Sequence, residues 1–523
     1  MAFYWFSDFL GLAQSSSTLQ SALIAVVFAL SILFLRSTWQ KLNVPLSIPG
    51  PLRLPFIGCL FVIPRFTLSR GEKREQFRVD MVKKYGSVYQ ITLFKVTFVF
   101  LNDVDSIKEA FVHKGDLISD RAPYTGPISG DRTKGVVQAM FDKDYREKKK
   151  LTLHSMKDFG FSGRSLENAV LNEASFLVEQ FKEEADGKNA TKIHQNLVAL
   201  AVSNVICIVV FGKRFDYGDA KFQSAVAGIR ACFSSTYSFW KRFPIVRHMR
   251  FVQELRSKAE KHGADATCFI SDEIESHRME FDPANSPKDF IDLCLRTEEE
   301  ERNQSMISTV GTEHMVQIIT DLFFAGTDTT AASLMWLLLY MMRYPEIQAR
   351  CQREIDGVPD AEDQLLQGNA SRVFPYTTAT LLETQRIAAI APASLPHAVR
   401  ETTTIGGYRL EKGSLVLANL WYLHMDESYW GDPYAFRPER WLDPKDPSKV
   451  LQHSNFMPFS MGKRRCLGEN LAKVEYSVFG VTLLRNFTFK MADAGNPPPL
   501  EGSSGGIINS PDPYEMVLEM RNP

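Results

Sequence analysis

The stretch that decides the fold is Phe459-Ser460-Met461-Gly462-Lys463-Arg464-Arg465-Cys466-Leu467-Gly468. It places a single cysteine in a glycine-bounded loop, directly before a helical run at 469–475. Backbone N–H groups and the positive end of a helix both stabilise a thiolate. Gly462 permits a tight turn, and Gly468 allows the backbone to approach a planar ligand closely. A buried structural cysteine is the alternative and the usual state of a free one, but basic residues surround Cys466.

Outside this loop, apolar residues follow the spacing of an α-helix over long stretches. On 310–342 the pattern includes Met315, Ile318, Ile319, Leu322 and Phe323 and predicts a helix of roughly thirty residues. The same spacing predicts helices at 104–114, 142–158, 165–184, 193–211, 221–234, 250–277, 342–355 and 376–388. Strand-like alternation is confined to short segments such as 87–101 and 403–418, and we expect charged surface connections at 278–305 and 356–372. The predicted fold is mainly α with small β-sheets.

Composition excludes several classes of protein. The 523 residues hold 60 Lys+Arg against 61 Asp+Glu, so bulk electrostatics give no case for nucleic-acid binding. Seven cysteines without any CxxC argue against a disulfide scaffold or a zinc ribbon. The six cysteines other than Cys466 are expected to be structural. An apolar share of 45% is enough to bury a large core.

The amino terminus is predicted to be a membrane anchor, residues 1–35. The 17 residues 19–35 are almost wholly apolar and would span about 26 Å as a helix, near the thickness of a bilayer core. Asp8 precedes this span, whereas Arg36 and Lys41 follow it, so the positive-inside rule puts the amino terminus in the lumen. A cleaved secretory signal is the alternative, but neither a basic leader nor a small-residue cleavage site is present.

Residues 36–55 form a basic, proline-rich hinge in this interpretation. Four prolines between 45 and 55 disfavour a helix there and indicate a stiff spacer that holds a cytosolic domain at the membrane surface. A proline-rich ligand for a partner is the alternative, although basic flanking residues are missing. Since no second linker or repeat follows, 56–523 is predicted to be one domain.

The long predicted helix carries Ala325-Gly326-Thr327-Asp328-Thr329-Thr330. Glycine inside a helix costs about 1 kcal/mol relative to alanine, so it usually has a packing or functional reason. We expect Gly326 to open room beside the helix, with the acid Asp328 and the alcohol Thr329 next to it. Polar residues on a solvated helix face are the alternative.

Five residues of the opening stretch, Phe459, Gly462, Arg464, Cys466 and Gly468, complete a haem-binding loop that resembles that of the cytochromes P-450. The resemblance runs essentially end to end and is strongest to the animal microsomal branch that hydroxylates steroids and xenobiotics. It implies the cytochrome P-450 fold after one transmembrane helix, haem b as the cofactor, and Cys466 as the axial iron ligand.

The same resemblance assigns roles to other residues. Glu383 and Arg386 look like the family's ExxR pair, and they share a helix face because they are three residues apart. Arg440 would join them in a structural network behind the haem. Thr329 would order a proton-donating water, and Asp328 would help to relay protons.

One departure concerns the haem propionates, which the resemblance assigns to Tyr145, Lys149, His397 and Arg464. The family's WxxxR appears here with Tyr145 for Trp and Lys149 for Arg, so a point charge replaces a bidentate fork. The alternative is that 148–150 is a solvated basic run and that Arg146 or another residue takes the propionate.

The implied function is a haem-thiolate monooxygenase that inserts one oxygen atom from O2 into a lipophilic substrate, such as a steroid, a fatty acid or a xenobiotic. Electrons would come from NADPH through NADPH–cytochrome P-450 reductase, with cytochrome b5 as a further candidate donor. The enzyme would be a single-pass protein of the endoplasmic reticulum membrane with its catalytic domain in the cytosol. The alternatives are a haem-thiolate isomerase or dehydratase acting on peroxides and a non-catalytic haem-binding protein.

Two surfaces follow from the same resemblance. Lys463, Arg465 and Lys473 are expected to belong to a basic patch that faces the reductase. The substrate pocket is expected along 119–138, 222–243, 318–329, 390–396 and 505–508.

Overall fold

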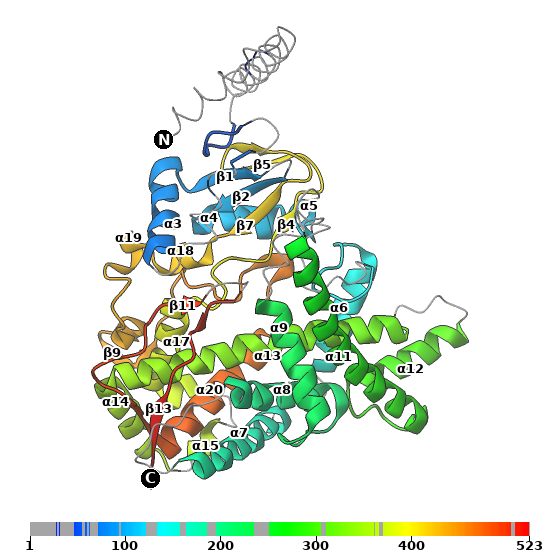
Figure 1. The fold of residues 1–523 in the computed structure, drawn as a ribbon, viewed down its shortest axis with the longest axis vertical. Helices are drawn as coiled ribbons and strands as arrows, with labels where there is room; N and C mark the ends of the chain where they lie inside the picture. Colours follow the sequence, from blue (N-terminus) through cyan, green and yellow to red (C-terminus); the bar gives the residue numbers. More distant parts are fainter. Residues whose placement is uncertain are drawn as a thin grey trace, which may run out of the picture.

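The computed structural model describes most of the chain between residues 47 and 521 (Figure 1). The described ranges are 47–54, 72–93, 96–121, 133–156, 164–185, 195–234, 250–304, 310–359, 361–365, 370–503 and 508–521, together with positions 28, 31, 58, 59 and 62. Phe28 and Ser31 are helical, but the rest of the predicted membrane anchor and most of the hinge lie outside the described residues.

Helices make up most of the described structure, as predicted. The longer ones are α3 (Glu72–Tyr85), α6 (Lys143–Ser155), α7 (Arg164–Glu184), α8 (Gln195–Phe211), α9 (Ala220–Ser234), α11 (Arg250–Glu280), α12 (Phe290–Asn303), α13 (Thr312–Arg343), α14 (Pro345–Asp356), α17 (Pro375–Ala388) and α20 (Glu469–Asn486). The shorter ones are α4 (Val104–Lys108), a π-helical turn (Glu109–His113), α5 (Gly115–Ile118), α15 (Ala361–Leu365), α16 (Ala370–Val373), α18 (Leu420–His424), α19 (Glu427–Trp430) and two 3-10 turns (Pro438–Trp441 and Gly462–Arg464).

The largest described sheet has five strands in the order β1-β2-β7-β4-β3 and lies in the upper part of the view in Figure 1, above most of the helices. Its strands are β1 (Val88–Leu93), β2 (Val96–Leu101), β3 (Asp120–Arg121), β4 (His397–Ala398) and β7 (Leu415–Ala418). The antiparallel pairing of β3 with β4 sets Arg121 opposite His397. The sheet therefore brings together two side chains that are distant in the sequence.

Four two-stranded sheets complete the β-structure that is described. Their strands are β5 (Thr403–Ile405), β6 (Tyr408–Leu410), β8 (Leu442–Asp443), β9 (Asp446–Val450), β10 (Phe487–Met491), β11 (Gly502–Ser503), β12 (Ser510–Pro511) and β13 (Met516–Met520). Strands occur in both predicted segments, since β1 and β2 lie in 87–101 and β5, β6 and β7 in 403–418.

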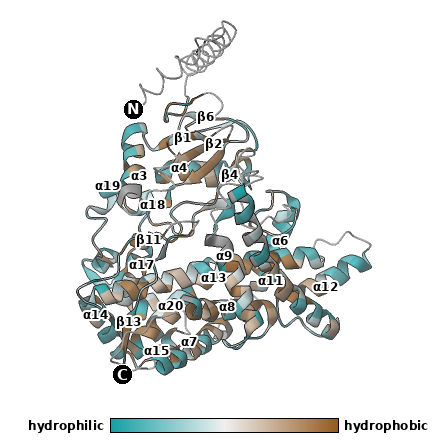
Figure 2. Ribbon diagram, viewed as in Figure 1, coloured by the Kyte–Doolittle hydropathy of each residue, from teal (hydrophilic) through white to brown (hydrophobic). Residues whose placement is uncertain are grey.

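The helix predicted at 310–342 is confirmed as α13, a 32-residue helix. Its stretch from Leu334 to Met342, near the carboxyl end, is buried on all sides, because α13 packs against α8, α17 and α20 in the centre of the helical part. Figure 2 shows hydrophobic residues along these packed helices and on β1 and β2. Among the described helices α13 alone is long and apolar enough to cross a membrane, but most of it is buried within the protein.

The expectation of surface connections at 278–305 and 356–372 is wrong, because both segments contain helices, and 356–372 holds α15 and the start of α16. The segment 278–305 is not only a surface connection, because it contains α12, which Asp289 caps by accepting a hydrogen bond from the N–H of Asp292. Four apolar residues of α12 are buried, but the acidic run at 298–301 hid this pattern in the sequence. The helix predicted at 104–114 is confirmed, with α4 continuing directly into the π-helical turn.

Candidate active site

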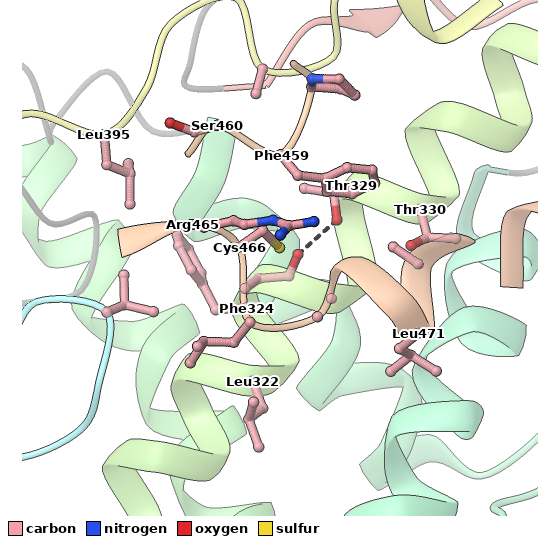
Figure 3. Close-up of a pocket in the computed structure, with 18 of the residues that line it drawn as sticks. Leu322, Phe324, Thr329, Thr330, Leu395, Phe459, Ser460, Arg465, Cys466 and Leu471 are labelled. Carbon is pink, nitrogen blue, oxygen red and sulfur yellow. Dashed lines mark hydrogen bonds between the residues drawn. The ribbon is translucent and has the colours of Figure 1, made fainter. Parts of the chain in front are cut away.

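A cavity of about 340 Å³ lies between α13 and the loop that carries Cys466 (Figure 3). Helix α8 supplies the aliphatic residues Ile206, Val209 and Val210, and α13 supplies residues between Asp321 and Ser333. The loops at 136–138, 390–395 and 458–468 supply most of the remaining wall. A largely apolar cavity of this size, with a few converging polar groups, is typical of a small-molecule site.

The cysteine loop is held in shape by its own backbone. The N–H of Cys466 donates to the carbonyl of Phe459 over 3.1 Å. Gly462 has φ = +79°, and a Cβ there would lie 2.0 Å from the carbonyl oxygen of Phe111, so only glycine fits. A Cβ added to Gly468 would meet nothing within 4 Å. The loop thus packs tightly at Gly462 and leaves open space at Gly468, beside the cavity.

Cys466 is exposed to this interior cavity. Burial in the surrounding protein raises the pKa of its thiol, while the N–H of Gly468 and the charge of Arg465 favour the thiolate. The negative charge of Glu469 disfavours the thiolate and so adds to the rise in the Cys466 pKa. A metal ion at the sulfur would supply the missing positive charge and deprotonate the thiol outright.

Thr329 and Asp328 lie on different faces of α13. Thr329 lines the cavity, and its hydroxyl donates to the carbonyl of Ala325 over 2.7 Å. Asp328 lies outside the lining and pairs with Arg230 of α9 over 2.9 Å. Burial raises the pKa of Asp328, and the Arg230 guanidinium opposes that rise. The alcohol therefore belongs to the cavity lining, whereas the acid is held by α9.

Gly326 is a packing glycine. A Cβ at this position would lie 2.5 Å from Cδ1 of Ile206 on α8, so the room beside the helix is filled by that side chain. One residue further on, Thr327 is buried and shares a hydrogen bond of 2.9 Å with Ser203 of α8. The glycine thus sets how closely α8 and α13 approach.

Three of the four residues predicted to hold the propionates line the cavity: Tyr145, His397 and Arg464. The Arg464 guanidinium lies over the Tyr145 ring, 3.8 Å from its centroid. Nδ1 of His397 is 2.9 Å from the carbonyl of Ile118, and burial together with the charge of Arg121 holds the His397 pKa well below its usual range. A neutral imidazole and a guanidinium therefore meet at one edge of the cavity.

Lys149, the fourth of these residues, is not among the residues that line the cavity. Its ammonium donates to the backbone carbonyl of Lys463 over 2.8 Å, which ties α6 to the cysteine loop. Burial and the nearby charge of Arg464 lower the Lys149 pKa.

Arg121 is the cavity-lining cation that sequence reasoning missed. It is buried and donates to the carbonyls of Val137, Leu395 and Pro396. Its place follows from the pairing of β3 with β4 opposite His397. Position 121 falls in the predicted pocket segment 119–138, but a two-residue strand leaves no periodic signal, so no role was predicted for this arginine.

The structure brings Glu383, Arg386 and Arg440 together. The Glu383 carboxylate accepts two hydrogen bonds of 2.8 Å from Arg386 and one of 3.0 Å from Arg440. The Trp441 indole adds a fourth donor at 2.9 Å. Such a network of buried charges is tolerated because its hydrogen-bonding groups are satisfied.

Comparison with known proteins decides the family. A family model described as Cytochrome P450 matches residues 48–518. The chain belongs to the cytochrome P450 family. Among its relatives, human cytochrome P450 2U1 is 33% identical over 498 residues, which cover 90% of this chain and 89% of that protein. Human cytochrome P450 2J2 is 35% identical over 472 residues, 89% of each protein.

Rat cytochrome P450 2C23 is 33% identical over 512 residues, which cover 95% of this chain and 98% of that protein. As a member of this family, the chain described here is a monooxygenase that binds haem b and acts with redox partners and oxygen on small molecules. The predicted family, enzyme class and cofactor are confirmed.

The donor set of the cavity fits haem. One thiol faces the space that Gly468 leaves open, as an axial ligand requires. At the edge, Arg121 and Arg464 offer two guanidinium groups for two carboxylates, and Tyr145 and His397 add further polar contacts. The apolar residues that α8 and α13 contribute would suit both the porphyrin and a lipophilic substrate.

Four of the five predicted pocket segments contribute described residues to the lining, and they share the apolar character expected of them. These residues include Val136 and Val137, Leu322 and Phe324, Ile390 and Leu395, and Ile508. The segment 222–243 contributes none among the residues described, whereas α8, which was not predicted to take part, contributes three. Most of 122–132, 235–243 and 504–507 lies outside the described residues.

Two buried acids in the lining had no place in the sequence interpretation. Burial raises the pKa of Asp321 on α13 to about 6, although N–H groups of Val137 and Val136 and the Gln317 amide oppose the rise. Burial likewise raises the pKa of Glu475 on α20 to about 8, opposed by a hydrogen bond from Thr330. One oxygen of Glu475 has no hydrogen-bond partner.

The basic residues beside the cysteine loop are each paired. Lys463 forms an ion pair with Asp116, and both Arg465 and Lys473 pair with Glu469. All three side chains nevertheless keep a third or more of their surface exposed. Their charge is thus available at the surface but partly neutralised.

Proposed function

We propose that this protein is a haem-thiolate monooxygenase that inserts one oxygen atom from O2 into a lipophilic molecule, such as a steroid, a fatty acid or a xenobiotic. The observation that carries this proposal is that Cys466 and Thr329 line the same, mainly apolar cavity. A ligand for iron and an alcohol that can position water therefore lie on opposing elements, with room for an apolar molecule beside them.

Haem bound in the cavity would supply the activation of O2 and the insertion of one of its atoms. Cys466 is the residue that would bind the iron, with Phe459, Gly462 and Gly468 shaping its loop. Arg121, Arg464, Tyr145 and His397 would hold the propionates. Lys149 would act on the propionates indirectly, through the cysteine loop to which its ammonium is hydrogen-bonded.

Thr329 and Asp328 would deliver protons. The Thr329 hydroxyl donates to Ala325, which leaves its oxygen lone pairs directed to the cavity, where they can accept a hydrogen bond from a water molecule. Asp328 is paired with Arg230, and burial raises its pKa while Arg230 opposes the rise; it is the acid next to Thr329 in the chain that could pass on protons. Protons would pass from Asp328 toward the water that Thr329 holds.

Glu383, Arg386 and Arg440 have a structural role in this proposal. They lie in a satisfied network and not in the cavity lining. The apolar wall formed by α8 and α13 would orient the substrate and exclude bulk water.

The electron donor would be NADPH–cytochrome P-450 reductase, with cytochrome b5 as a second donor. Supporting this proposal, Lys463, Arg465 and Lys473 expose positive charge on the side of the cysteine loop. Residues 1–35 would anchor the protein in the endoplasmic reticulum membrane, residues 36–55 would form the hinge, and residues 56–523 the cytosolic catalytic domain.

The test compares Cys466→Ala with Cys268→Ala, which removes an exposed cysteine on α11. With reductase, NADPH and a panel of lipids, steroids and drugs, we expect product from wild type and from Cys268→Ala but none from Cys466→Ala. The carbon monoxide complex of the reduced protein should show the red-shifted band of a thiolate ligand only where Cys466 is intact. Product formation without NADPH would instead favour the isomerase alternative, and haem binding without any turnover the non-catalytic one.

A further inference from the structure

The segment 133–139 forms part of the cavity wall and is bound to α13 by one carboxylate. The N–H groups of Val136 and Val137 donate to the same oxygen, Oδ2 of Asp321, over 2.7 and 2.9 Å. The amide of Gln317 donates to the other oxygen, Oδ1, over 3.1 Å. Asp321 is buried, so these hydrogen bonds replace the water that it lost on folding.

The residues of α13 that take part lie on one face of the helix. Glu313, Gln317 and Asp321 are each four residues apart, which places them in line along the helix surface. Glu313 pairs with Lys134 at the exposed end of the segment, and Asp321 binds its buried end. The segment therefore lies along α13 over two turns of the helix.

Gly135 makes this close approach possible. Its φ is +74°, and a Cβ added there would lie 2.5 Å from Oδ2 of Asp321 and 2.6 Å from Cγ of Gln317. No side chain fits between the segment and the acid.

The carbonyl groups of the same segment bind the two arginines at the edge of the cavity. Arg464 donates to the carbonyls of Val136 and Ala139, and Arg121 donates to that of Val137. The segment thus has its N–H groups on Asp321 and its carbonyl groups on the cations that we propose for the propionates.

We propose that Asp321 is a positioning residue that fixes the segment 133–139, and through it both the substrate-side wall and the placement of Arg121 and Arg464. Its function is to accept hydrogen bonds, and its negative charge is not required. The consequences for haem and substrate rest on the proposed function, whereas the consequence for the backbone of the segment does not. A carboxylate that pairs with a cationic substrate would be a different role, and the variants below separate the two.

The matched variants are Asp321→Asn and Asp321→Leu in the full-length holoprotein. The single oxygen of asparagine can occupy the place of Oδ2 and accept both N–H groups, and Gln317 can turn its amide to accept from the new NH2 group. Leucine has the same branched shape, with two bulkier methyl groups in place of the carboxylate oxygens, and it has no acceptor. By hydrogen exchange with mass spectrometry, peptides covering 133–141 should exchange about tenfold faster or more in Asp321→Leu, and within about twofold of wild type in Asp321→Asn.

Ligand and haem binding give the second readout. Asp321→Leu should bind apolar ligands several-fold more weakly and transfer haem to apomyoglobin faster, whereas Asp321→Asn should resemble wild type in both respects. Unchanged exchange in Asp321→Leu would overturn the proposal. Loss of protection in Asp321→Asn to the level of Asp321→Leu would also overturn it, since the charge would then be essential.

A second pair of variants leaves Asp321 intact and changes the segment 133–139 that it binds. Gly135→Ala introduces the clash, while Gly407→Ala, at a similar φ of +77° with nothing within 4 Å, carries the same backbone strain without a neighbour. Faster exchange at 133–141 in Gly135→Ala, but not in Gly407→Ala, supports the proposal, and equal behaviour of the two variants overturns it. If all variants bind haem normally but none turns over substrate, the proposed function fails while the backbone result stands.

Discussion

The cysteine loop and the opposite wall of the cavity are built in different ways. The loop is one contiguous stretch, 459–468, and its shape follows from local features such as the positive φ of Gly462 and the hydrogen bond from Cys466 to Phe459. The wall is assembled from α8, α13 and the segment 133–139, which lie far apart in the sequence. A contiguous site can be identified from a sequence pattern, whereas an assembled one depends on contacts that only the fold creates.

The largest expected effect concerns the network around Glu383, in which Arg440 from a later segment joins the contiguous pair Glu383 and Arg386. Glu383→Ala leaves Arg386 and Arg440 buried without their carboxylate, and breaking a buried ion pair from one side costs about 3–5 kcal/mol. We expect little folded, haem-containing protein when haem content and thermal unfolding are measured.

The control is Glu439→Ala, which removes a half-exposed carboxylate paired with Arg350. Exposed pairs contribute about 0–1 kcal/mol, so haem content should stay at the wild-type level. If both variants lost haem equally, the buried network would be no more important for the fold than an exposed ion pair, and the structural role proposed for it would be wrong.

The next effect depends on pH and concerns Glu475, whose pKa the fold raises from 4.5 to about 8. Below about pH 4.5 the carboxyl group is protonated in both the folded and the unfolded state. As the pH rises from there toward 8, the unfolded state loses its proton first, so the free energy of unfolding falls. Glu475→Gln removes this dependence and should gain about 2 kcal/mol relative to wild type between pH 5 and pH 7.

Denaturant unfolding followed by tryptophan fluorescence at several pH values would measure this gain. Glu469 on the same helix is the control because its pKa is shifted the other way: burial opposes the change, but hydrogen bonds from Arg465 and Lys473 lower it. Glu469→Gln should therefore lose stability relative to wild type above the unfolded-state pKa, and the difference should vanish as the pH falls. Parallel profiles for the two variants would contradict the assignment for Glu475.

These residues also show how far the sequence could be read. The long helix, the Glu383–Arg386 pair and the cysteine loop each lie in one segment. Periodicity predicted the helix, and resemblance to the family's motifs identified the pair and the loop. Arg121 and Asp321 gave no such signal, because the first depends on a two-residue strand and the second on a loop that folds against α13 from almost two hundred positions away. The contribution of α8 was missed because its uniformly apolar sequence is equally typical of a core helix.

A smaller effect is expected from a change in the packing distance between α8 and α13, the two helices of the cavity wall. Gly326→Ala gains helix propensity of about 1 kcal/mol but forces Cδ1 of Ile206 to move, which costs a similar amount, so the net change in stability should be small. Since Ile206 lines the cavity, its displaced methyl group should instead weaken the binding of bulky ligands.

Ile206→Val removes the clashing methyl group and should restore ligand binding in the double variant. The interaction between the two substitutions in a double-mutant cycle should amount to about 1 kcal/mol. Additive effects on the ligand dissociation constants would show that the contact between α8 and α13 does not set the space in the cavity.

The smallest effect lies where the two regions meet, at Lys149. The resemblance to the family implies that Lys149 holds a propionate, whereas in the structure its ammonium donates to the carbonyl of Lys463. Lys149→Met keeps the aliphatic length and removes only the donor, so we expect a loss of about 1 kcal/mol in stability. The transfer of haem to apomyoglobin should stay near the wild-type rate, while Arg464→Met, at a residue that lines the cavity, should accelerate it.

If Lys149→Met instead released haem as fast as Arg464→Met, the Lys149 side chain of the wild type would have to turn from Lys463 toward the propionate once haem binds. Lys149→Arg should then slow haem release below the wild-type rate, because a guanidinium can bind a carboxylate through two hydrogen bonds.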